Sequence, residues 1–69
     1  MKNARKLDVQ VTRIGYIVFE FVALTAKAKR WTRKHIEASA LRENCFLAEN
    51  RQARDIADAM AAEGMVIGP

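Results

Sequence analysis

The sequence predicts an α+β fold: a small ββαβαβ domain in which a short mixed sheet carries two helices packed on one face. Residues 7–24 alternate in polarity with the period of a strand, and residues 26–36 and 51–63 repeat apolar side chains with the period of a helix. A chain of 69 residues has room for a single domain, residues 1–69. We expect residues 1–6 to be disordered, because they are polar and terminal.

The first two strands form a hairpin. Residues 7–13 alternate apolar and polar side chains, Gly15 supplies the turn, and residues 16–24 alternate again. Glu20 marks the more exposed face of the second strand. The side chains expected to face the core are Leu7, Val9 and Val11 in the first strand and Ile17, Phe19, Phe21 and Ala23 in the second.

The first helix is expected over residues 26–36. Thr25 is a suitable N-cap, because its hydroxyl can accept a backbone N–H of the first turn. Leu24, Ala28, Trp31 and His35 fall on one arc, so we interpret Trp31 as a core residue and His35 as a partly buried one. If Trp31 is fully buried, its replacement by alanine costs about 3–5 kcal/mol.

The second helix follows a short apolar strand at residues 45–48. Asn50 is its expected cap, and Gly64 is its expected C′ residue in the left-handed conformation. Residues 65–67 then return as a short strand. The order strand, helix, strand predicts a right-handed parallel crossover between the second and third strands. The core stripe of this helix is Ala53, Ile56, Ala57 and Met60.

These two helices resemble a family of small uncharacterised bacterial and phage proteins. Their pattern is a Leu-Thr-x-x-Ala-x-x-Trp helix, then a Glu-x-Arg-x-x-x-Asp-Ile-x-x-x-Met-x-x-x-Gly helix, and it covers roughly residues 15–67. The resemblance implies no established activity. The chain departs from the family because residues 1–14 are an extension and the outer face of its first helix is wholly basic. The matching positions are Leu24, Thr25, Ala28, Trp31, Glu49, Arg51, Asp55, Ile56, Met60 and Gly64.

Basic side chains crowd the first helix. Five Lys or Arg lie within residues 27–34, and like charges this dense repel one another. A nucleic-acid backbone would relieve that repulsion. The alternatives are a solvated face, or a face paired with acids of the second half, since Trp31 is expected in the core and not among the cations. The candidate contacts are Lys27, Lys29, Arg30, Arg33 and Lys34.

Arg51 is a further candidate anion contact. It lies near the start of the second helix, where backbone N–H groups attract anions. The structural alternative, which we favour, is that Glu49 stabilises the helix start while Arg51 and Asp55 form a local pair.

The sequence predicts no enzyme. His35 and Cys45 are the one combination of nucleophile and base, and nothing in the sequence brings them together; Cys45 is interpreted as a small core residue. The chain has no glycine-rich phosphate loop and no metal-ligand spacing. We therefore expect no catalytic residue, cofactor, metal or small-molecule substrate.

Charge is divided along the chain. Residues 1–36 hold nine Lys or Arg against two acids, a net charge of +7, whereas residues 37–69 hold three against six, a net charge of −3. The apolar run at residues 14–19 is too short for a signal peptide or a membrane span. We expect a cytoplasmic protein that does not enter membranes.

The function predicted from these observations is a non-enzymatic interaction module that binds a protein partner or itself, with a homodimer as one form. A core of this size is marginal, and a short sheet has edges that can pair across chains. Residues 7–13 are the expected pairing edge. The alternative function is nucleic-acid binding through residues 27–34.

Overall fold

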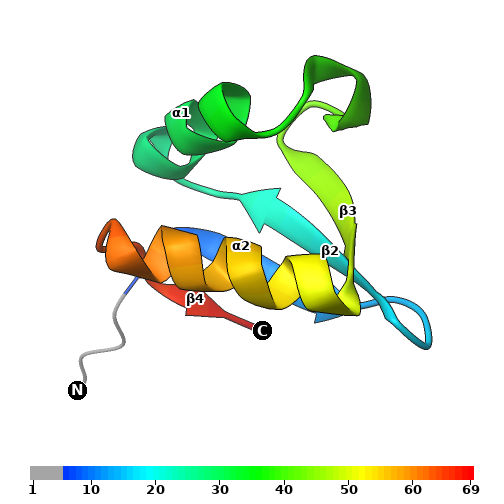
Figure 1. Cartoon of the computed structure of the whole chain (residues 1–69). Coiled ribbons are helices and arrows are strands. Elements are labelled where there is room, and N and C mark those ends of the chain that lie inside the picture. Colours follow the sequence, from blue (N-terminus) through cyan, green and yellow to red (C-terminus); the bar gives the residue numbers. More distant parts are fainter. Residues whose placement is uncertain (1–5) are drawn as a thin grey trace.

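The computed structural model describes residues 6–69, and it confirms the ββαβαβ order and the α+β class (Figure 1). Apart from Lys6, the segment expected to be disordered lies outside the described residues. The elements are β1 (Val9–Arg13), β2 (Val18–Ala23), α1 (Ala26–His35), a 3₁₀-helix (Ala38–Ala40), β3 (Cys45–Glu49), α2 (Asn50–Ala62) and β4 (Ile67–Gly68).

The sheet has the order β3-β2-β1-β4. β2 is antiparallel to both β1 and β3, whereas β4 runs parallel to β1. The parallel crossover expected between β2 and β3 is therefore wrong, because these strands are antiparallel neighbours. The edge expected at residues 7–13 is wrong for its first part, because β4 pairs with Val9 and Gln10 on the outer side of β1; β4 does not pair with residues 11–13. The edges of the described sheet are β3 and β4.

One face of the sheet forms the core with both helices. Val9 and Phe21 of this face are fully buried, as is Met60 of α2. Phe21 and Phe46 occupy paired positions on β2 and β3, and their rings stack with centroids 4.9 Å apart. The inward positions predicted for the two strands are confirmed for Val9, Phe21 and Ala23, which are buried, but not for Ile17, which precedes β2 and is 49% exposed. The short apolar strand expected at residues 45–48 forms as β3, and its side chains alternate in burial, because Leu47 is 58% exposed between the buried Phe46 and Ala48.

The helix signals are confirmed with one exception. The Thr25 side chain accepts the N–H of Ala28 at the start of α1. Gly64 has φ of 86°, and the N–H groups of Gly64 and Met65 bond back to carbonyls of the last turn of α2, as in a Schellman motif. Asn50, however, lies inside α2, and the N-cap is Glu49 without a side-chain hydrogen bond.

Asp8 connects β1 to two distant segments. One carboxylate oxygen accepts the Thr25 hydroxyl at 2.7 Å, and the other accepts the N–H of Val66 at 2.8 Å. Its backbone N–H also bonds to the Val66 carbonyl, and its carbonyl accepts the N–H of Leu24. This residue therefore ties the start of α1 and the entry to β4 to the same strand.

Asp8→Ala removes the acceptor of two of these bonds and leaves the Val66 N–H without its partner. We expect the free energy of unfolding to fall by about 2–3 kcal/mol, and by about 1 kcal/mol for Thr25→Ala. Because both changes remove the Asp8–Thr25 bond, the double variant should lose less than the two single losses together. Urea denaturation followed by circular dichroism measures all three, with Thr25→Ser as the control that keeps the hydroxyl. Strictly additive losses would contradict this role.

Candidate functional site

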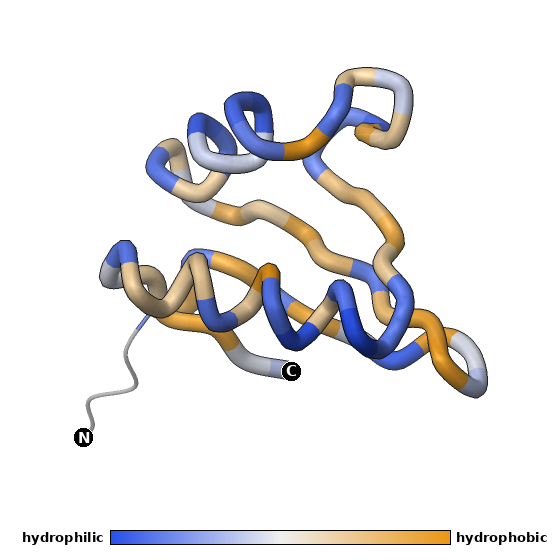
Figure 2. The backbone as a smooth tube through the Cα atoms, viewed as in Figure 1, coloured by the Kyte–Doolittle hydropathy of each residue, from blue (hydrophilic) through white to orange (hydrophobic). Residues whose placement is uncertain are grey.

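The five predicted cations lie on the sides of α1 that are not buried in the core. Ala28 and Thr32 are the buried positions of α1 and Trp31 packs partly against the core, so most of the other positions face away from it. Lys29 is half-buried and the other four cations are exposed. Within residues 6–69 none of the five forms an ion pair with a carboxylate, so of the two structural alternatives the face paired with acids of the second half is not found. Hydrophilic residues dominate this helix in Figure 2.

Three of these cations line a groove between α1 and the end of α2. We call it the basic groove; its volume is about 430 Å³. Lys27, Arg30 and Lys34 stand on its α1 side, while Lys29 and Arg33 do not line it. The remaining lining residues are Trp31, His35, Glu63 and Met65.

Two aromatic rings lie among these cations. The indole of Trp31 and the imidazole of His35 are in contact, with centroids 4.3 Å apart and planes tilted by 31°. Trp31 is half-buried against the core, not fully buried as expected, and it also lines the basic groove. His35 is exposed, so its interpretation as a partly buried residue is wrong. It is the last residue of α1, beyond the buried turn, and its ring rests on the indole instead.

Arg51 does not join the basic groove. It is exposed in the first turn of α2 and lines a separate depression with Asn50, Arg54 and Asp55. The expected pair between Arg51 and Asp55 does not form among the described residues. The structure therefore separates the sixth predicted anion contact from the five on α1.

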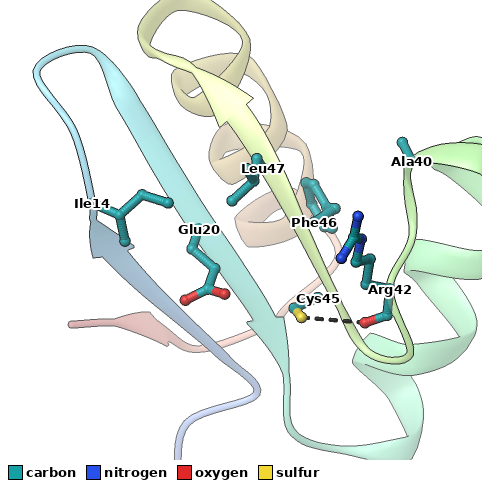
Figure 3. Close-up of a pocket in the computed structure, with 7 residues that line it drawn as sticks. All are labelled: Ile14, Glu20, Ala40, Arg42, Cys45, Phe46 and Leu47. Atoms are coloured by element: carbon teal, nitrogen blue, oxygen red, sulfur yellow. Dashed lines mark hydrogen bonds between the residues drawn. The ribbon is translucent and has the colours of Figure 1, made fainter.

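The face of the sheet opposite the helices carries a second feature that the sequence analysis did not identify. Figure 3 shows Glu20 and Leu47 on the side of the sheet away from α2, next to Ile14. This open-face hollow has a volume of about 560 Å³. Leu47 is 58% exposed and Ile14 is 52% exposed. The hollow is lined by Ile14, Glu20, Ala40, Arg42, Cys45, Phe46 and Leu47.

One signal for this face was present in the sequence. Val18 and Val22 flank Glu20 at alternate positions of β2, so the face marked as exposed is mostly apolar. Strand pairing then places Leu47 opposite Glu20 and Cys45 opposite Val22. The sequence does not give the register between β2 and β3, and this register decides which apolar side chains of the two strands lie next to each other on the open face.

Cys45 and His35 do not meet. Cys45 is half-buried in the open-face hollow, not in the core as expected, and its thiol donates to the Arg42 carbonyl at 3.2 Å. His35 lies on α1 and does not line that hollow. The arrangement holds no thiol and imidazole within hydrogen-bonding reach.

No metal or membrane feature is found in the described part of the chain. Among residues 6–69, no three His, Cys, Asp or Glu side chains are grouped so that they can hold a metal ion. No helix of the same residues has the length and apolarity needed to cross a membrane. Comparisons with protein-family models, curated proteins and solved structures gave no match for this chain.

Trp31→Ala tests how far the indole supports the core. We expect a loss of about 2 kcal/mol in the free energy of unfolding, below the 3–5 kcal/mol of a fully buried aromatic residue, because part of the ring faces the groove. Thermal unfolding followed by circular dichroism measures it, and Trp31→Phe, which keeps a ring, should lose less. An unchanged melting temperature for Trp31→Ala would show that the indole contributes nothing to packing.

Proposed function

We propose that this protein is a non-enzymatic interaction module that binds a second copy of itself through the open face of its sheet. The observation that carries the proposal is the uncovered apolar surface opposite the helices, where Leu47 and Ile14 are about half exposed. Apolar surface of this kind gains free energy when a partner removes it from water. A cytoplasmic location is part of the proposal.

Charge on this face favours a second copy as the partner. Glu20 and Arg42 line the same hollow with opposite charges, and within residues 6–69 they form no ion pair. In a two-fold dimer the same surface of both copies meets, so any contact between two different residues occurs twice. Glu20 of each copy can therefore face Arg42 of the other copy. One surface that carries both signs is thus complementary to itself.

Pairing through a sheet edge is less well supported. The bonds from Asn50 to Ile17 and from Ala23 to Asn44 direct the even-numbered groups of β3 towards β2, so its odd-numbered groups point outward. Cys45 already bonds to Arg42 through both its N–H and its carbonyl. Within β3 the outer edge therefore offers only Leu47 and Glu49, which is a short ladder for a stable pair.

The self-association can be tested by sedimentation equilibrium and by exchanging the two charges. Glu20→Arg gives a face with two cations and Arg42→Glu gives a face with two anions, so each variant should be monomeric. The double variant Glu20→Arg/Arg42→Glu should associate again, and a mixture of the two single variants should form a heterodimer. Leu47→Asp should abolish association by placing a charge in the apolar part of the face.

The matched control is Asp58→Arg, which makes the same change of charge on an exposed position of α2 and should leave association intact. A parent protein that stays monomeric at every concentration tested overturns the proposal. Dimers that ignore all the face substitutions overturn it as well, because they require a different interface such as the edge of β3.

A further inference from the structure

We propose that the basic groove binds single-stranded nucleic acid, with phosphates along its cations and a base stacked on its rings. The groove combines three cations on one side of α1 with an indole and an imidazole in contact, their planes tilted by 31°. Basic grooves with aromatic platforms are the usual means by which proteins bind single strands without sequence preference. This inference does not depend on the proposed self-association.

The cations form a row along the helix. Lys27, Arg30 and Lys34 are three and four residues apart, so they lie on one side of α1 and extend over roughly 10 Å at 1.5 Å per residue. A row of this length can contact successive phosphates of an extended strand. Lys29 and Arg33 are outside the groove, so they add to the surrounding field without contacting the same strand.

No acidic side chain of the described part of the molecule pairs with this row. Residues three and four apart on a helix are neighbours, and like charges there destabilise it. None of the groove cations forms an ion pair within residues 6–69. Glu63 lines the groove but is not within ion-pair distance of them. A bound phosphate backbone would supply the missing counter-charge.

The ring stack distinguishes a nucleic acid from other anions. Trp31 is held against the core, and His35 lies exposed on top of it, so the stack has a fixed inner ring and an accessible outer ring. An unpaired base has a flat surface that can extend such a stack. A duplex keeps its bases covered, and an acidic peptide has no equivalent surface. These features favour a single strand over both.

The groove and the open-face hollow lie on opposite sides of the sheet. Both helices contribute to the core on one face, whereas the Glu20 and Leu47 side chains of the hollow lie on the other face (Figure 3). Association through the open face would leave each basic groove accessible. The two activities can therefore be tested separately in one protein.

The binding experiment uses labelled oligothymidine and oligouridine of about 12 nucleotides. Fluorescence anisotropy should report binding at low salt. The emission of Trp31, the sole tryptophan, should change on titration because a base joins its stack. For three phosphate contacts, log K should fall against log salt with a slope of about −2.

Matched variants on the same helix locate the site. Arg30→Gln should weaken binding and reduce the salt slope by about 0.7, because it removes one phosphate contact. Arg33→Gln removes the same charge outside the groove and should have the smaller effect. Glu63→Gln should strengthen binding, since it removes an anion from the groove. His35→Ala should weaken binding about 5- to 100-fold through lost stacking, and His35→Phe should preserve it.

Several results would overturn the inference. One is the absence of binding at low salt, and another is equal loss of affinity for Arg30→Gln and Arg33→Gln, which would indicate a diffuse field without a site. Equal affinity for a duplex or for polyglutamate, with no change in Trp31 emission, would refute the role of the rings. Dimer formation measured on the same samples keeps this result distinct from the proposed self-association.

Discussion

The Asp8 carboxylate joins three segments that lie far apart in the sequence. It accepts the Thr25 hydroxyl 17 residues away and the Val66 N–H 58 residues away. Val66 directly precedes β4, so this contact brings the last strand to the outer side of β1. Thr25 caps α1, so the same carboxylate also fixes where that helix begins. This one side chain therefore links the start of α1 and the approach to β4 to the segment that leads into β1.

Local features of the fold could be predicted from the sequence, and long-range ones could not. The cap at Thr25, the left-handed Gly64 and the alternation in the second half of β2 each depend on a few neighbouring residues, and they are confirmed. Strand order depends instead on contacts such as that between Asp8 and Val66, which no period or cap reveals. The position of β4 beside β1 and the antiparallel pairing of β3 with β2 are both long-range arrangements of this kind.

The candidate site also has features that the sequence predicts and features that only the fold reveals. The run of cations in residues 27–34 is visible in the sequence, but their separation into groove and outer positions depends on where α2 ends against α1. His35 is exposed because it is the last residue of α1, and helical periodicity does not show where the helix passes beyond the core. The open-face hollow required the register that sets Leu47 opposite Glu20.

Because helices cover only one face of the sheet, the other face of this small domain is exposed to solvent. The apolar side chains of β2 and β3 that point away from the helices have no second layer within residues 6–69, and a second copy would provide one. The cations of α1 lie on the side of the sheet that the helices cover, away from this apolar face. Folding does not pair the α1 cations with the acids of the second half, so their field points outward on the side of the helices. An anion would therefore be drawn to α1, while the opposite face stays available for apolar contact.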